Sequence, residues 1–247
     1  MADFRMMDSI LAKTSRLTLA FAWAVVATSA APPTAGAQLR LRPKRVTFWV
    51  GAATVMAASA LIDERARSYS LEHRSGIARS FADAGNAAGT GRNIVVGLAL
   101  TYVGARLTHH RAAASDVLRI SAGYAVSNAI VGVLKPLAGR HRPDSTNDAW
   151  RFRPLSGGGE WHSFSSSHAV HAFSLAAGLA VASRRPWVGA LGYTGAGVVA
   201  WSRLYDDQHW ASDVTASAVI GVSAAATVLD WLDRRYPRRQ DRASGKR

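Results

Sequence analysis

Three short stretches of the chain concentrate histidines, fixed cations and small hydroxyl residues. They cover residues 135–143 (KPLAGRHRP), 163–168 (SFSSSH) and 202–213 (SRLYDDQHWASD). Lys135, Arg142 and Arg203 supply fixed positive charge, and such groups match the oxygens of a phosphate. If the three stretches meet at helix ends, they form a site for a multiply charged oxyanion, and the pattern therefore indicates phosphoryl-transfer chemistry.

Two histidines in these stretches can be given chemical roles. His209 and Asp213 are four residues apart, so on one helical turn the carboxylate can hold the imidazole by its Nδ1–H. This orientation leaves the other ring nitrogen unprotonated, as a nucleophile requires. His168 arrives from another segment and can act as the general acid that protonates the leaving alkoxide.

The stretches lie at the ends of apolar segments, which must position them. These segments are rich in Ala and Gly and cover residues 46–62, 94–107, 117–137, 169–183, 187–201 and 214–229. Helix formers dominate and strand-type alternation is rare, so we predict an all-α, six-helix bundle that spans a membrane. An up-and-down arrangement brings all three stretches to one end of the bundle.

The order of the motifs resembles that of the type-2 phosphatidic acid phosphatase and vanadium haloperoxidase superfamily. The likeness covers about residues 94–229 and rests on K-x6-R-P, a serine-rich run ending in His, and S-R-x5-H-x3-D. It implies a phosphate cradle made of Lys135, Arg142, Ser166, the amide of Ser167, and Arg203. It also implies that His168 is the general acid and that His209 is the nucleophile, which forms a phosphohistidine. Asp213 is then the residue that orients His209.

The second motif departs from the family pattern. The family usually has Pro-Ser-Gly-His, whereas this chain has Ser165-Ser166-Ser167-His168. The turn thus lacks a residue with a fixed φ and a conformationally permissive glycine. The Ser and His that carry the chemistry remain, so the replacement bears mainly on the geometry of the amide donors.

Other polar residues near the motifs are not assigned catalytic roles. A His–Asp pair with His162 and His171 nearby could bind a metal ion, but the surrounding Arg and Lys charges repel a cation. We therefore predict no metal and no cofactor. We expect His162 and His171 to lie near the mouth of the site or to pack on neighbours, and Asp206 and Asp207 to be solvated.

The composition limits the class of protein. Among 247 residues, 49% are hydrophobic and none is Cys, which excludes disulfides, thiolate nucleophiles and Cys-ligated zinc. The net charge of +14 suggests an anionic partner such as a phosphate or an anionic lipid. We find no strand-rich RNA-binding pattern and no zinc finger, so we expect no nucleic-acid partner. The sequence assigns no oligomeric state.

The chain divides into three predicted parts. Residues 1–37 resemble a signal peptide or an N-terminal anchor, because basic residues precede an apolar run and a small-x-small cleavage site. Residues 38–233 form the helical bundle, and residues 234–247 form a basic tail. This organisation places the protein in the cell envelope.

The loop charges predict an orientation. Arg106, Arg111, Arg184, Arg185 and the basic tail lie at the end of the bundle opposite the motifs. The positive-inside rule makes that end cytoplasmic, so the site faces the periplasm. A cleaved leader followed by a span over 46–62 would turn the site inward instead. Either the leader adds no separate span, or it is cleaved and a periplasmic domain remains. We favour a multi-pass inner-membrane protein.

We expect a phosphatase that hydrolyses phosphomonoesters, with a lipid phosphate as the substrate. Phosphatidic acid and an isoprenoid pyrophosphate are examples of this class. The alternatives are a soluble, periplasmic, non-specific acid phosphatase, a vanadate-dependent haloperoxidase and a non-catalytic phosphate-binding membrane protein. The short chain without large insertions argues against the haloperoxidase, whereas the altered second motif makes the non-catalytic alternative conceivable.

Overall fold

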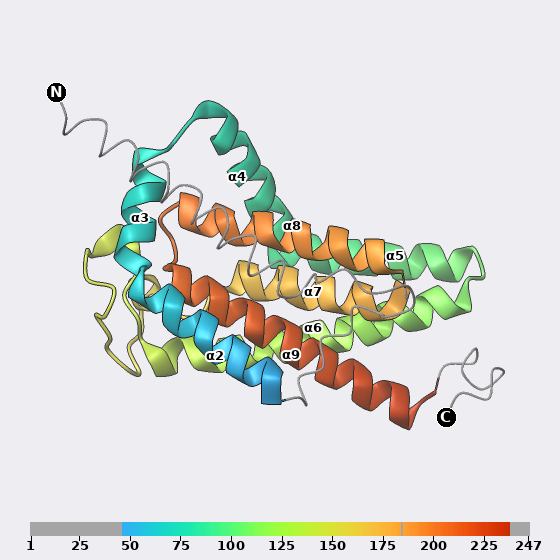
Figure 1. Cartoon of the computed structure of the whole chain (residues 1–247). Coiled ribbons are helices and arrows are strands. Elements are labelled where there is room, and N and C mark those ends of the chain that lie inside the picture. The colour runs from blue at the N-terminus through green and yellow to red at the C-terminus, as the bar shows by residue number, and fades with distance from the viewer. Residues whose placement is uncertain (1–45, 184, 238–247) are drawn as a thin grey trace.

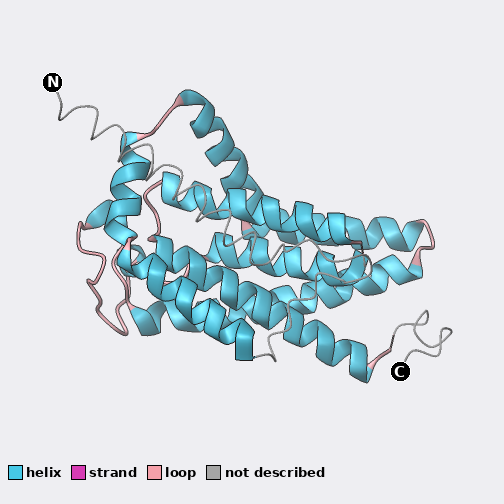
Figure 2. Ribbon diagram, in the orientation of Figure 1, coloured by secondary structure: helices cyan, strands magenta, loops and turns pink. Residues whose placement is uncertain are grey.

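The computed structural model describes residues 46–183 and 185–237, and most of this part is helical (Figure 2). Its α-helices are α2 (Val46–Leu61), α3 (Asp63–Glu72), α4 (Gly76–Gly89), α5 (Gly91–Leu107), α6 (Arg111–Ala138), α7 (Ser167–Ser183), α8 (Pro186–Tyr205) and α9 (Ala211–Arg235). Two short 3₁₀ helices, η1 (Pro143–Ser145) and η2 (Gly159–Trp161), lie between α6 and α7. The predicted all-α class is therefore confirmed.

All the apolar segments expected from the sequence are helices, and α3 and α4 are additional. These two occupy the polar stretch that precedes α5. Helix α4 begins after Ser75, whose side chain accepts a hydrogen bond from the amide of Ala78 at 3.2 Å. Its buried residues are Ala82, Gly85 and Gly89. Such small residues give no strong apolar signal, which is why the sequence shows only a polar stretch here.

Helix α7 lies at the centre of the bundle and packs against α6, α8 and α9 (Figure 1). The core around it consists mainly of alanines and valines, with Phe173, Tyr193 and Leu229 as its large members. A Cβ on Gly221 of α9 would lie 2.8 Å from the carbonyl oxygen of Val170 in α7. Glycine at this position therefore allows the two backbones to approach closely, which places the first turn of α7 against the third turn of α9.

A glycine turn directs the first motif across the end of the bundle. Gly139 follows α6 in the left-handed conformation, with φ at 56°, and its amide donates to the carbonyl of Lys135 at 3.0 Å. A Cβ at Gly139 would lie 1.8 Å from the carbonyl oxygen of Arg153. Both observations require glycine here. The turn places the next residue, Arg140, in the buried end of the bundle.

A bend of 61° separates α2 from α3. Asp63, the first residue of α3, is only 2% exposed. Its carboxylate accepts hydrogen bonds from the amide of Ser212 at 2.8 Å and from Arg140 at 2.7 Å. The bend therefore fastens the first helices to the beginning of α9.

The helices have the character of a membrane protein. Within the described residues, α6 and α9 are long and apolar enough to cross a membrane, and the bent pair α2–α3 could supply a third, broken span. Helix α5 adds an outward apolar face, formed by Val95, Val96, Leu100, Val103 and Leu107. Apolar side chains turned outward in such numbers suit a hydrocarbon surrounding.

The predicted leader over residues 1–37 lies outside the described residues, as does the tail beyond residue 237. The boundaries of the three predicted parts of the chain therefore remain predictions.

Candidate active site

The three motif stretches meet at one end of the bundle, where α6 and α8 end and α7 and α9 begin (Figure 1). Two hydrogen bonds join the first and third stretches to the second. The amide of Ser163 donates to the carbonyl oxygen of Arg140 at 3.0 Å. His209 Nδ1 lies 2.7 Å from the carbonyl oxygen of Ser163. The convergence expected from the topology of the bundle is therefore present.

His209 lies in the connection between α8 and α9 and is 5% exposed. Because a carbonyl oxygen only accepts hydrogen bonds, the Nδ1 that faces Ser163 must carry the hydrogen. Nε2 then holds a lone pair, and the described residues offer it no hydrogen-bond partner. This is the tautomer that a nitrogen nucleophile requires.

Burial keeps the His209 imidazole neutral. Desolvation is the largest cause and lowers the pKa of His209 to about 4, although Asp213 acts in the opposite direction. The charges of Lys135 and Arg142 lower this pKa further. The two cations of the predicted phosphate cradle therefore act on this pKa in the same direction as burial.

The depressed pKa predicts an acid-dependent loss of stability. An unfolded histidine has a pKa of about 6.5, whereas the pKa of folded His209 is about 4. Between these two pH values the unfolded chain binds a proton at this residue and the folded chain does not. The free energy of unfolding therefore falls as the pH drops through this window, with no contribution from this group at pH above the window.

A His209→Gln variant checks this stability effect, because glutamine does not titrate. The melting temperature of the wild type in detergent should fall more between about pH 7 and about pH 5 than that of the variant. Equal falls in the two proteins would show that His209 is not held neutral by burial.

Asp213 lies near the His209 ring but makes no direct hydrogen bond to it. Its carboxylate is 3.8 Å from Nδ1 of His209, which is beyond hydrogen-bond length. It accepts shorter hydrogen bonds from Ser163 Oγ at 2.5 Å and from the amide of Trp210 at 2.9 Å. The expected direct bond is thus replaced by one to a backbone carbonyl, because Ser163 stands next to the ring and is itself fixed by Asp213.

Arg140, which the sequence analysis did not single out, supports Asp213 from the other side. It is 3% exposed and donates to Asp213 at 2.6 Å and to Asp63 at 2.7 Å. A buried guanidinium between two buried carboxylates fixes all three groups. The position of Arg140 inside the first motif, between Lys135 and Arg142, is the one sequence signal that could have pointed to it.

The three predicted cations act on one another and on the second histidine. The charge of Lys135 interacts with those of Arg142 and Arg203, and Arg203 is the main charged neighbour of His168. Arg203 is 8% exposed and donates to the side chain of Asn86, a residue of α4 that the sequence analysis missed. A dense group of fixed cations favours an anionic ligand at this place.

The second motif forms the start of α7. Ser166 is fully buried, and its hydroxyl accepts a hydrogen bond from the amide of Ala169 at 3.4 Å while its own amide donates to Ser217 at 2.8 Å. Its predicted contact with phosphate would therefore use its hydroxyl hydrogen. Ser167 and His168 are partly exposed in the first turn, where amides lack intrahelical partners and the helix dipole is positive. Their roles toward phosphate remain predictions.

The expectations for the other polar residues near the motifs were only partly right. Asp207 is not solvated, because its carboxylate accepts hydrogen bonds from Arg67 at 2.7 and 2.9 Å. Asp206 accepts a hydrogen bond from Asn86. Both partners come from α3 and α4, the helices that the sequence did not show. His171 packs on its neighbours, with hydrogen bonds to the end of α4 and to α6.

Comparisons with known proteins indicate the family and the fold. The sequence model of the PAP2 superfamily matches residues 116–237. A lipid A 1-phosphatase from Porphyromonas gingivalis is 34% identical over 102 residues, which are 40% of this chain and 20% of that protein. The chain therefore spans only about a fifth of the length of this relative.

Two crystal structures share the fold. Aquifex aeolicus LpxE is 19% identical, with a TM-score of 0.53 over 71% of this chain and 94% of that one. A transmembrane PAP2-type phosphatidylglycerolphosphate phosphatase from Bacillus subtilis is 18% identical, with a TM-score of 0.60 over 77% of this chain and 98% of that one. The two structures show that the fold is shared, and the match of the sequence model confirms the resemblance seen in the motifs: residues 116–237 form a PAP2-superfamily segment.

Proposed function

We propose that this protein is a phosphatase that hydrolyses lipid phosphomonoesters by transferring the phosphoryl group first to His209 and then to water. The observation that carries the proposal is the state of His209. Its ring is buried and neutral, its Nδ1–H is committed to the Ser163 carbonyl, and its Nε2 lone pair is free among fixed cations. Such an arrangement suits attack on a phosphorus atom whose oxygens the cations neutralise.

The first step breaks the ester. The Nε2 lone pair of His209 attacks phosphorus, the P–O bond to the leaving group breaks, and the electron pair leaves with that oxygen. His168 gives its proton to the leaving oxygen. Lys135, Arg142 and Arg203 balance the charge on the phosphoryl oxygens throughout, which is the main contribution that a protein can make to such a reaction.

The second step releases phosphate. A water molecule attacks phosphorus, the P–N bond to His209 breaks, and His168 accepts the proton of the water. Inorganic phosphate departs, and both histidines return to their starting states. Each step uses groups already at the site.

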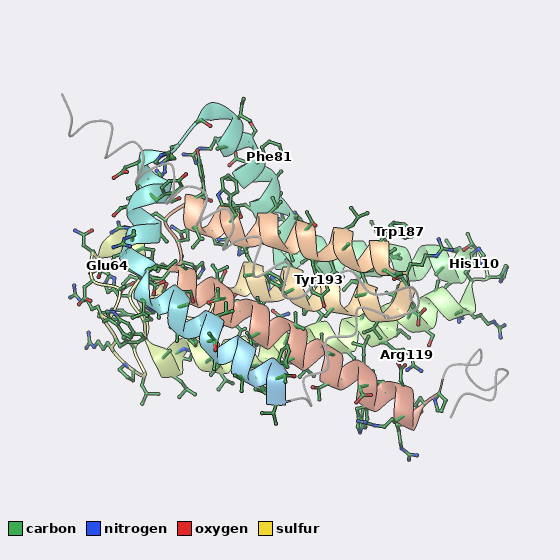
Figure 3. All side chains as sticks on the ribbon, viewed as in Figure 1. Glu64, Phe81, His110, Arg119, Trp187 and Tyr193 are labelled. Atoms are coloured by element: carbon green, nitrogen blue, oxygen red, sulfur yellow. The ribbon has the colours of Figure 1, made fainter. Side chains whose placement is uncertain are left out.

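A lipid substrate and a periplasmic site fit the surroundings of this end of the bundle. The outward apolar residues and the membrane-capable helices favour a substrate that is itself held in the bilayer. His110 and Arg119, labelled in Figure 3, lie near the opposite end, close to Arg106, Arg111 and Arg234. The positive-inside rule makes that end cytoplasmic.

A panel of phosphoesters tests the proposal. The full chain in detergent micelles should release phosphate from phosphatidic acid and from isoprenoid phosphates, with no loss of rate in EDTA. Failure to release phosphate from any ester would favour a non-catalytic binding protein, and EDTA inhibition restored by a divalent cation would overturn the mechanism. Halide oxidation after addition of vanadate and hydrogen peroxide would indicate the haloperoxidase alternative.

The role of His168 predicts a dependence on the leaving group. His168→Ala should slow hydrolysis of an alkyl phosphate by about 10²- to 10⁴-fold, because a strongly basic alkoxide needs a proton as it leaves. It should slow hydrolysis of p-nitrophenyl phosphate much less, since nitrophenolate leaves without one. The measurement is the ratio of kcat/KM for the two esters, which reports the first step alone, because loss of the base in the second step lowers kcat for both esters. An equal loss of kcat/KM on both esters would exclude His168 as the acid.

A further inference from the structure

His171 lies on α7 one turn after His168 and has no part in the proposed reaction. It is buried, with 8% of its surface exposed. Its Nδ1 lies 3.0 Å from the carbonyl oxygen of Gly89, the last residue of α4, and must carry the hydrogen because a carbonyl oxygen only accepts. The side-chain amide of Asn128 in α6 contacts Nε2 at 2.5 Å. The imidazole therefore joins the end of α4 to both α6 and α7.

The end of α4 lies directly against the side chain of His168. A Cβ added to Gly89 would lie 3.1 Å from both Cβ and Cδ2 of His168. Within the described residues, no group makes a hydrogen bond to either ring nitrogen of His168. Packing against its neighbours therefore sets the orientation of this imidazole, and the backbone of Gly89 is one wall of the space that it occupies.

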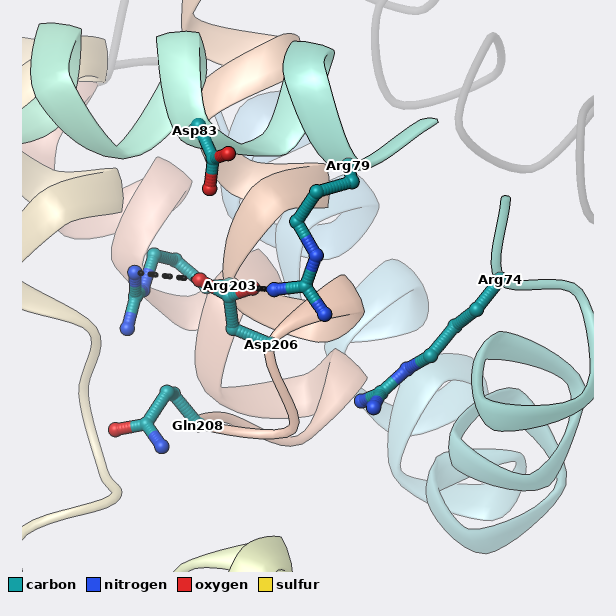
Figure 4. A pocket seen from close by; sticks show the side chains of 6 residues that line it. All are labelled: Arg74, Arg79, Asp83, Arg203, Asp206 and Gln208. Atoms are coloured by element: carbon teal, nitrogen blue, oxygen red, sulfur yellow. Dashed lines mark ion pairs between the residues drawn. The ribbon is translucent and has the colours of Figure 1, made fainter. Parts of the chain in front are cut away.

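The other parts of α4 have different surroundings. Its first half borders a polar cleft of about 360 Å³, which Arg79 and Asp83 line from this helix (Figure 4). Further along, a close backbone contact holds α4 against α8, because a Cβ at Gly85 would lie 3.0 Å from the carbonyl oxygen of Val198. This contact lies one turn before the end of α4, so the hydrogen bond from α7 is what fixes the last carbonyl.

We infer that His171 is a positioning residue, which holds the backbone of Gly89 against His168 and thereby orients the proposed general acid. The inference rests on the proposed function, because it assumes that His168 protonates the leaving group. Without the bond from His171, the end of α4 can move away from the ring of His168, and the ring gains rotamers that point away from the leaving oxygen. A displacement of about 1 Å can cost about 10²-fold in rate.

The test uses the ratio of kcat/KM for octyl phosphate over kcat/KM for p-nitrophenyl phosphate, measured on the full chain in detergent. His171→Ala should lower this ratio about tenfold relative to the wild type, because only the alkyl ester needs the acid. His171→Gln keeps an N–H donor and should recover most of the ratio. Ser127→Ala is the matched control, since it removes a buried hydroxyl that bonds only within α6, and it should leave the ratio unchanged.

Two further variants separate positioning from a general loss of stability. In a His168→Ala background, adding His171→Ala should leave the ratio unchanged, because no acid remains to be oriented. Asn128→Ala removes the partner of Nε2 and should lower the ratio in the same direction as His171→Ala. This variant tests the inference even where His171→Ala does not fold.

Three outcomes contradict the inference. A wild-type ratio in folded His171→Ala, a wild-type ratio in Asn128→Ala, or a further fall of the ratio in the double variant would overturn it and leave the proposed function standing. A wild-type ratio in His168→Ala itself would overturn both the inference and the proposed role of His168.

Discussion

His209→Ala should abolish phosphate release, with a loss of more than about 10⁴-fold in kcat, because the proposed mechanism assigns the covalent intermediate to this ring. The same variant should trap no phosphate on the protein. The measurement is phosphate release from phosphatidic acid, together with protein-bound phosphate after rapid alkaline quenching, since the P–N bond is labile in acid.

The matched control is His110→Ala, because His110 is an exposed histidine at the opposite end of the bundle. It should retain the wild-type rate and the trapped phosphoenzyme. A His209→Ala protein that stays folded and still forms a covalent phosphoenzyme would remove His209 from its proposed role.

Arg140→Met should lower the free energy of unfolding by about 3–5 kcal/mol, because it leaves two carboxylates buried without their cation. Asp63 is 2% exposed and Asp213 is fully buried, so water cannot replace the lost charge. The variant should also lose phosphatase activity, since Asp213 holds Ser163 and the carbonyl of Ser163 holds His209. Thermal unfolding in detergent, followed by circular dichroism, measures the first effect.

Two further variants make this result specific. Arg234→Gln breaks an exposed ion pair with Asp230, in which the side chains are 56% and 49% exposed, and should cost no more than about 1 kcal/mol. Adding Asp63→Asn to Arg140→Met should recover part of the lost stability, because it removes one uncompensated charge. A melting temperature of Arg140→Met equal to that of the wild type would contradict the buried network.

The sequence predicts the general plan of this site because spacing and apolar patterns carry the relevant information. Long apolar segments mark the helices, and their antiparallel order brings Lys135, His168 and His209 to one end. The assignment of individual roles came from the resemblance to the family, which extends over the motifs. These features are local in the sequence, so they can be recognised without knowing how the chain packs.

The parts that could not be predicted depend on contacts between distant residues. Asp63 contacts Arg140, and Asn86 contacts Arg203, although the partners are far apart in the sequence. An arginine or asparagine in a polar stretch gives no sign of whether it will be buried. The partner of the His209 ring is a backbone carbonyl, and every residue has one, so no side-chain pattern could distinguish Ser163 from its neighbours.

The ion-pair network around Arg140 has a consequence for dissecting this protein. The segment that matches the family, residues 116–237, contains Arg140 and Asp213 but lacks Asp63 and Asn86. Expressed by itself, it would leave Arg140 with one counter-charge instead of two and Arg203 without its amide partner. We therefore expect this segment to be less stable by itself than the longer chain, and chimeras between related proteins should carry α2, α3 and α4 together with the bundle that they complete.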